Sequence, residues 1–409
     1  MSVLGRVVIV GLAVLIGRQA SADGANLFAT SWTEGKRIDA ERALPPTTFY
    51  ESPLPVVPKN AGSLIRSEVA QEYSLPPGVT ATRILYYTRT PAGVDAVSSG
   101  VVLVPYGTPP PGGWPLIAWS HGTSGVAHSC APSLMRSLFY NWEGLFEYVM
   151  LGFAVVATDY AGLGTDGRHA YVDMLSNGAD VIYSVPAARS AVSNLSSKWV
   201  IVGHSQGGLS SLGAAQLEAA KKDPGYLGTV ALAGASDLED LIDAALAAKA
   251  PVLNGLLAFG VYGFQTLYPQ LAAESVLTAA AAKQYSMFVT DGCSAASGAF
   301  GALPVDGMYR PDWKRDPSVQ LMLERTRPGA KPARGPLLLV TGGADPLFTV
   351  KASKTVFERL CRSGERVQRS IYPGLGHDPL VFGSLTEQIE WIKGRFSGAP
   401  APSNCNLPK

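Results

Sequence analysis

The chain has 409 residues, and its 33 Lys and Arg against 32 Asp and Glu leave a formal net charge of +1. This balance argues against a dedicated nucleic-acid binder, which normally carries a basic excess, so no nucleic-acid partner is expected. The 47% of hydrophobic and 16% of charged residues exclude extended disorder and fit a large globular protein with many loops.

The first 22 residues have the pattern of a secretory signal peptide. Arg6 precedes an apolar run over residues 7–16, and Ala20-Ser21-Ala22 supplies small residues for cleavage. This apolar run is too short to span a bilayer, and later apolar runs are broken by Gly, Pro or charge. We therefore expect cleavage near Ala22 and a secreted or periplasmic protein, with an uncleaved anchor as the alternative.

Residues 23–80 contain several prolines and are interpreted as an N-terminal arm packed over the surface. Residues 83–88 and 101–105 have the composition of strands and are separated by the turn Pro91-Ala92-Gly93. Together they predict an antiparallel hairpin at the start of the main fold.

Beyond this hairpin, short apolar runs alternate with helical stretches, which predicts a doubly wound, mostly parallel α/β sheet. The expected strands are 116–119, 153–158, 199–202, 230–233, 337–340 and 367–372. The expected helices are 142–150, 180–192, 207–221, 351–360 and 384–396.

One connection is too long for a simple crossover, because structureless loops of roughly 100 residues are rare. We assign residues 236–330 to a helical cap, and residues 81–235 and 331–409 to the α/β core. The cap begins with Ser236-Asp237-Leu238-Glu239, which has the pattern of a capping box ahead of apolar residues at helical spacing.

The four cysteines all follow the predicted signal peptide. An even number of cysteines in an exported chain predicts two disulfides, formed by Cys130, Cys293, Cys361 and Cys405. Their spacing lacks the short pairs typical of a zinc site, and the chain has only 5 His. No metal or organic cofactor is expected, and three pairings of the cysteines stay open.

The sequence Gly203-His204-Ser205-Gln206-Gly207 follows an expected strand and precedes an Ala-rich and Leu-rich helix. This is the strand-turn-helix context of a nucleophile elbow, in which the two glycines avoid collisions within a tight turn. The alternative is a glycine-rich turn with an incidental serine. The context favours Ser205 as a nucleophile, exposed at the edge of the sheet.

A serine hydroxyl needs a base to take its proton, and in this fold the order along the chain is serine, acid, histidine. Three of the histidines precede Ser205, and His204 lies within the elbow with its side chain on the wrong side for proton transfer. His377 remains, in a Gly-rich and Pro-rich loop after the last expected strand. We predict His377 as the general base.

The acid of the triad is expected at the carboxyl end of a strand. Asp345 fits this position best, since it follows the strand at 337–340 and precedes the predicted base by one helix and one strand. Asp237 is the alternative, but it lies in a helix-capping sequence. Asp378 adjoins the predicted base in sequence and is expected to point elsewhere.

Acyl transfer also requires donors for the oxyanion. One expected donor is the backbone N–H of Gln206, directly after the nucleophile. The second is expected in the loop 120–125 after the strand 116–119, where Thr123 is favoured and Gly122 is the alternative. A plain turn is the competing interpretation of this loop.

Several motifs together resemble one known family. They are His121-Gly122-Thr123, Cys130-Ala131-Pro132-Ser133, Asp159-Tyr160-Ala161-Gly162-Leu163-Gly164 and Gly203-His204-Ser205-Gln206-Gly207-Gly208. They resemble the secretory lipase family of α/β hydrolases, to which the fungal lipase A enzymes belong. The resemblance covers nearly the whole mature chain and is weakest in the cap.

The resemblance implies the α/β-hydrolase fold and an ester hydrolase with the triad Ser205, Asp345 and His377. It also implies disulfides between Cys130 and Cys293 and between Cys361 and Cys405. We interpret Asp159 as structural, with a partner in the loop near the oxyanion strand.

The sequence therefore predicts a secreted lipase or carboxylesterase that cleaves lipophilic carboxylic esters through an acyl-enzyme. Its partners are a small-molecule or lipid ester and, transiently, a lipid interface. A peptidase or acyltransferase with the same triad, and a non-catalytic binding protein on this fold, are the alternatives. The preferred acyl chain and the oligomeric state are left open.

Overall fold

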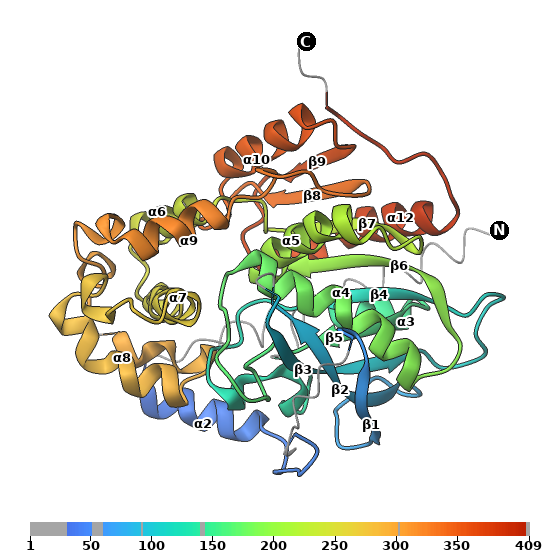
Figure 1. Ribbon diagram of the computed structural model, residues 1–409, viewed down its shortest axis with the longest axis horizontal. Helices are drawn as coiled ribbons and strands as arrows, with labels where there is room; N and C mark the ends of the chain where they lie inside the picture. The colour runs from blue at the N-terminus through green and yellow to red at the C-terminus, as the bar shows by residue number, and fades with distance from the viewer. Residues whose placement is uncertain (1–30, 51–59, 91–92, 140–143, 302, 406–409) are drawn as a thin grey trace.

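The computed structural model describes residues 31–50, 60–90, 93–139, 144–301 and 303–405 (Figure 1). The predicted signal peptide, residues 1–22, lies outside these residues. Within the described part of the chain, no helix is both long and apolar enough to cross a membrane.

The centre of the molecule is a nine-stranded sheet with the strand order β1-β2-β3-β5-β4-β6-β7-β8-β9. The first three strands are antiparallel, β3 pairs antiparallel with β5, and the pairs from β5 to β9 are all parallel. The strands are β1 (Leu64–Ala70), β2 (Thr80–Arg89), β3 (Asp95–Val104), β4 (Trp114–Ser120), β5 (Ala154–Thr158), β6 (Leu195–His204), β7 (Tyr226–Leu232), β8 (Leu337–Gly342) and β9 (Val367–Tyr372). The predicted α/β-hydrolase fold, with its mostly parallel sheet, is confirmed.

Helices cover both faces of this sheet. Alternate residues of the strands enter different clusters: Leu116 packs with α4, whereas its neighbour Ile117 packs in the cluster that contains α12. This alternation follows from the two-residue period of a strand and explains why the central strands are apolar throughout. The helices of the core are α3 (Leu145–Met150), α4 (Met174–Ala191), α5 (Gln206–Lys221), α10 (Val350–Arg362), α11 (Pro379–Gly383) and α12 (Leu385–Phe396).

Residues 236–330, here called the cap segment, are mainly helical. They lie beside the sheet, on the left in Figure 1. The helices are α6 (Leu238–Ala248), α7 (Asn254–Leu267), α8 (Ala279–Asp291) and α9 (Pro317–Arg325), with short 3-10 helices between them, including η5 (Ser294–Phe300).

The capping-box interpretation at the start of the cap segment is wrong. Asp237, not Ser236, is the N-cap residue of α6, and no side chain caps this helix end. The carboxylate of Asp237 instead accepts two hydrogen bonds from the guanidinium of Arg359, at 2.7 and 2.8 Å. The local pattern predicted a helix cap, but the Asp237 side chain binds an arginine that is distant in sequence.

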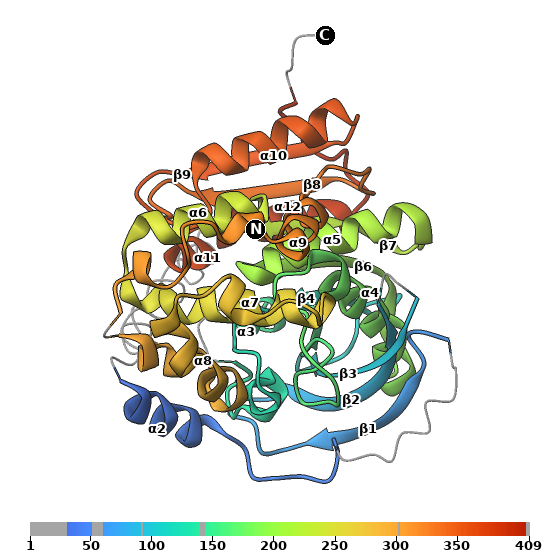
Figure 2. The same ribbon diagram turned by 60° about the vertical axis from the view of Figure 1, so that its left-hand side comes forward.

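The described part of the region predicted as an N-terminal arm, residues 31–50 and 60–80, contains a helix and a strand. The helix α2 (Trp32–Arg42) lies against α8 and η5, where a Cβ on Gly35 would come within 2.4 Å of the Ala296 Cα (Figure 2). The strand β1 extends the sheet by pairing with β2. The arm therefore contacts both the cap segment and the sheet, which its proline content did not indicate.

Candidate active site

Ser205 occupies a strained turn between β6 and α5. Its backbone angles are φ 58° and ψ −122°, in a region that non-glycine residues rarely adopt. The glycines on either side are required by contact: a Cβ on Gly207 would lie 1.8 Å from the Ser120 carbonyl oxygen, and one on Gly203 would lie 2.3 Å from the Gly207 oxygen. The sequence motif thus folds as an elbow that projects Ser205 from the sheet edge.

Three side chains from different strand ends form one chain of hydrogen bonds. The Ser205 hydroxyl lies 2.8 Å from Nε2 of His377, and Nδ1 of the same ring lies 2.8 Å from Oδ2 of Asp345. Asp345 follows β8 and His377 follows β9, so parallel strands bring these residues to the same edge as the elbow. The histidine side chain is 17% exposed, whereas the aspartate side chain is fully buried.

The carboxylate of Asp345 is held in its charged form. Burial by itself would raise its pKa, but the neighbouring His377 and the backbone N–H groups of Leu347 and Phe348 outweigh burial and lower it. An ionised Asp345 accepts a hydrogen bond from the Nδ1–H group of the histidine, which leaves Nε2 with a lone pair toward the serine.

Two aromatic rings fix the plane of the His377 ring. Phe348 stacks on it with ring centroids 5.5 Å apart, and His204 lies 4.7 Å away at a tilt. Nε2 of His204 also lies 3.2 Å from the carbonyl oxygen of His377. His204 thus contacts the backbone of the loop that carries His377.

The other candidate acids are placed differently. Asp237 accepts hydrogen bonds from Arg359, as described above. Asp378 was expected to point elsewhere, yet it has a carboxyl oxygen within 4.8 Å of ligand nitrogens of His204 and His377. The hydrogen bond to Nδ1 nevertheless comes from Asp345.

The same three residues, His204, His377 and Asp378, are the one group in the described part of the chain with a spacing suited to a metal ion. The His377 ring, however, already contacts the serine and Asp345 through its two nitrogens. A cation here would compete with this arrangement for the imidazole.

Both predicted oxyanion donors lie at the cavity that contains Ser205. Gln206 is the first residue of α5, where a backbone N–H has no partner within the helix. Thr123 follows β4, and its hydroxyl lies 2.8 Å from the Tyr171 hydroxyl. The elbow and the end of β4 are in close contact, because a Cβ on Gly207 would lie 1.8 Å from the Ser120 carbonyl oxygen.

A buried network behind Gln206 was missed by the sequence analysis. The side-chain amide of Gln206 donates to Nε2 of His169, at 3.0 Å, and to Oδ1 of Asn177, at 3.2 Å. Burial lowers the pKa of His169 to about 3, so its ring stays neutral and can accept this hydrogen bond. No motif marks these residues, because the contacts join positions that are far apart in sequence.

The cavity next to Ser205 is small and apolar, with a volume of about 50 Å³. The cap segment forms much of its wall through α6, α7 and Tyr309, and the core adds Leu347 and Phe348. The cap residues that line it are Leu238, Leu241, Ile242, Ala245, Leu256, Leu257, Gly260 and Tyr309. Such a wall accommodates an apolar group better than a charged one.

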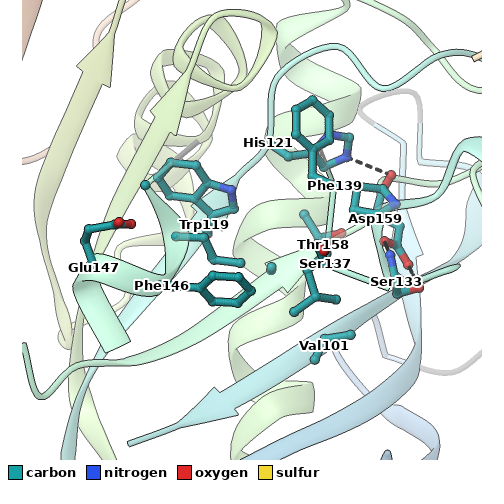
Figure 3. Close-up of a pocket in the computed structure, with 15 residues that line it drawn as sticks. Val101, Trp119, His121, Ser133, Ser137, Phe139, Phe146, Glu147, Thr158 and Asp159 are labelled. Atoms are coloured by element: carbon teal, nitrogen blue, oxygen red, sulfur yellow. Dashed lines mark hydrogen bonds between the residues drawn. The ribbon is translucent and has the colours of Figure 1, made fainter. Parts of the chain in front are cut away.

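A second cavity of about 40 Å³ lies near the ends of β4 and β5 and has no triad residue in its wall (Figure 3). The carboxylate of Asp159 accepts hydrogen bonds there from Ser133 and from Ser99. Burial raises its pKa to about 6, although these hydrogen bonds oppose the shift. Asp159 anchors the loop at Ser133, in agreement with the structural role predicted for it.

The two predicted disulfides are present. Cys130 pairs with Cys293 and Cys361 pairs with Cys405, which are the pairings implied by the family resemblance. The first joins the core to the cap segment, and the second joins α10 to the C-terminal residues.

Comparison with known proteins supports a single family. The sequence model of the "Secretory lipase" family matches residues 143–404, which is more than half of the chain. A comparison with curated protein sequences gave no match.

Solved structures share the fold at low sequence identity. Candida antarctica lipase A in its closed state is 16% identical, with a TM-score of 0.76 over 90% of each chain. The rice cell wall degrading esterase LipA from Xanthomonas oryzae is 20% identical, with a TM-score of 0.66 over 83% of this chain and 98% of that one. A putative hydrolase from Legionella pneumophila is 19% identical, with a TM-score of 0.65 over 81% of this chain and 98% of its own.

Proposed function

Because this chain belongs to the secretory lipase family, we propose that it hydrolyses carboxylic esters through an acyl-enzyme formed on Ser205. The observation that carries the proposal is the continuous hydrogen-bond chain from Ser205 through His377 to Asp345. A serine in this arrangement is activated for attack on an acyl carbon.

In the proposed mechanism, Nε2 of His377 accepts the proton of Ser205 as the hydroxyl attacks the ester carbonyl. The backbone N–H groups of Gln206 and Thr123 stabilise the resulting oxyanion. The imidazolium, held by the charged Asp345, then protonates the leaving alcohol. Water activated by the same ring attacks the acyl-enzyme and releases the acid.

The substrate proposed is a lipophilic ester. The wall of the Ser205 cavity is built mainly from apolar side chains of α6 and α7, and the family acts in general on esters of lipids. The small volume of the Ser205 cavity favours short acyl chains unless the cap segment moves.

We further propose that the protein acts after export. We also propose that residues 236–330 form a separate cap domain over the core, with residues 23–80 as an arm.

Labelling with a fluorophosphonate probe tests the nucleophile. We expect a single adduct on Ser205 of the folded protein and none after Ser205→Ala, together with loss of p-nitrophenyl ester hydrolysis by about 10⁴-fold or more. A folded wild-type protein that takes up no label would contradict the proposal.

A chain-length series of esters, assayed below and above their solubility limits, tests the substrate class. Faster hydrolysis of dissolved short esters is expected from the small cavity, and a jump in rate above the solubility limit would indicate a lipase that requires an interface. Peptide anilides serve as the control, because their preferential cleavage would identify a peptidase.

A further inference from the structure

The cap segment reaches the oxyanion loop, here residues 121–125, through Ser294. The hydroxyl of Ser294 donates to the carbonyl oxygen of Thr123 at 2.6 Å, and its backbone N–H donates to the carbonyl oxygen of Ser124 at 2.8 Å. Ser294 is 1% exposed and lies at the start of η5. It is 171 residues distant from Thr123 in sequence, so only the tertiary structure brings them together.

The disulfide next to Ser294 reinforces this contact. Cys293 forms an isolated β-bridge with Gly125 and is bonded to Cys130. A Cβ on Gly125 would lie 2.6 Å from the Cys130 sulfur, which shows how closely the loop passes the disulfide. The oxyanion loop is therefore attached to the cap segment by hydrogen bonds along two consecutive residues and is backed by a covalent link.

Thr123 is held on its other sides by the core. Its hydroxyl contacts Tyr171, and the carbonyl oxygen of Gly122, which belongs to the same peptide unit as the Thr123 N–H, lies 2.6 Å from Nδ1 of His121. Because a peptide unit is planar and trans, fixing the Gly122 oxygen directs the Thr123 N–H to the opposite side. Ser294 supplies a further constraint, at the carbonyl of Thr123 itself.

We propose that Ser294 is a positioning residue for the oxyanion hole, so that the cap segment sets the orientation of a backbone donor it does not itself contain. This inference rests on the proposed function, in which the Thr123 N–H stabilises the oxyanion. Ser294 lies outside the wall of the Ser205 cavity, so it acts through Thr123 and not on the substrate.

The test compares two buried serines of the same 3-10 helix. Ser294→Ala removes the hydrogen bond to Thr123, whereas Ser297→Ala removes one from the Ser297 hydroxyl to the Ser294 carbonyl, within the helix. Loss of an oxyanion donor costs about 10²–10³-fold in kcat, so a donor that is displaced but retained is expected to cost about tenfold. Ser294→Ala should lower kcat by this amount with KM nearly unchanged, and Ser297→Ala should leave kcat within about twofold.

A trifluoromethyl ketone inhibitor gives a readout that a purely structural role would not change. It forms a tetrahedral adduct with the nucleophilic serine, and the oxygen of this adduct occupies the oxyanion hole. Ser294→Ala should raise the inhibition constant of the trifluoromethyl ketone by the same factor by which it lowers kcat, whereas Ser297→Ala should leave this constant unchanged. Equal inhibition constants for the two variants would overturn the proposal.

Ser294→Cys provides a second variant, because it keeps a side chain of similar size and replaces the hydroxyl that donates to Thr123 by a weak S–H donor. It should also weaken inhibition by the trifluoromethyl ketone, and it decides the matter if Ser294→Ala does not fold; unchanged inhibition would then overturn the inference. Assays of the wild type and of Ser205→Ala distinguish failure of the proposed function from failure of the positioning role. If the wild type hydrolyses no ester, the proposed function fails, and if it does but Ser294→Ala behaves as Ser297→Ala, only the positioning role fails.

Discussion

The α/β core and the cap segment meet at the site but contribute to it in different ways. The core supplies the three side chains of the hydrogen-bond chain, each from a turn at the carboxyl end of a parallel strand. The cap segment supplies apolar side chains of the cavity wall and, through Ser294, two hydrogen bonds to the oxyanion loop. The sheet thus fixes the side chains proposed to react, whereas the cap segment, packed beside the sheet, supplies the side chains that line the cavity and contact the loop.

Because the core supplies the side chains of the hydrogen-bond chain, we expect the largest effect on kcat from a substitution of its buried acid. Asp345→Asn should lower kcat by roughly 10³–10⁴-fold, because a neutral amide no longer holds the required tautomer of His377 or stabilises its charged form. Asp237→Asn is the matched control, since it also follows a strand but binds Arg359. It should lower the Tm and leave kcat within about twofold. A control as inactive as Asp345→Asn would break the comparison.

The disulfides test whether attachment of the cap segment affects activity. In the chain-entropy description, loss of the Cys130–Cys293 link costs about 5 kcal/mol of stability and loss of the Cys361–Cys405 link about 4 kcal/mol, because the first closes the longer loop. We expect urea unfolding of the two double Cys-to-Ser variants to show losses of unfolding free energy close to these values. Only the pair at Cys130 and Cys293 should also lower kcat, since it adjoins the oxyanion loop; an equal loss in both pairs would contradict this.

Two buried acids of the core should give opposite pH dependences. The pKa of Asp159 is raised to about 6, so its contribution to stability is present below the unfolded value near 4 and is lost as pH rises through 6. The lowered pKa of Asp345 gives a contribution that is lost as pH falls. Relative to Asp159→Asn, the wild type should gain about 2 kcal/mol of unfolding free energy when the pH is lowered from 8 to 4, because the unfolded carboxyl is already about half protonated at pH 4. Urea unfolding at several pH values measures this difference in unfolding free energy. If the unfolding free energies of the wild type and Asp159→Asn change in parallel with pH, the raised pKa of Asp159 is contradicted.

The smallest effect is expected from the cap side of the cavity. A Cβ on Gly260 would lie 3.1 Å from the Tyr309 hydroxyl, so Gly260→Leu should narrow the cavity. We expect kcat/KM for p-nitrophenyl octanoate to fall about tenfold relative to the acetate. Leu256→Ala should shift the ratio in the opposite direction. If neither variant changes the ratio, the acyl group does not occupy this cavity.

The core was predicted closely because its signals are local. Each strand is a short apolar run, and the elbow is a contiguous motif whose glycines are required by contacts within the turn and with the adjacent strand end. The roles of Ser205, His377 and Asp345 follow from their order along the chain and their positions after strands. These roles stay predictions, although the structure brings the three side chains within hydrogen-bonding distance.

The cap segment and the N-terminal arm were predicted in outline only. The capping box did not form, because Asp237 and not Ser236 is the N-cap residue and the Glu239 carboxylate accepts a hydrogen bond from Lys314, 75 residues away. The strand β1 was missed because an edge strand can form from a partly exposed sequence when a neighbouring strand offers free backbone groups. In both cases the residues that determine the local structure lie outside the sequence segment that carries the pattern.

The sequence by itself determined the family, the order of the core strands and helices after the N-terminal arm, and the residues predicted to perform acyl transfer, since these depend on residue type and near-neighbour spacing. Only the tertiary structure gave the hydrogen bond between Asp345 and His377, the contacts of His169 and Asn177 with Gln206, and the contact of Ser294 with Thr123. The physical reason is that a hydrogen bond requires its two groups to lie within about 3 Å. Residue spacing along the chain does not specify that distance once the partners lie on different elements.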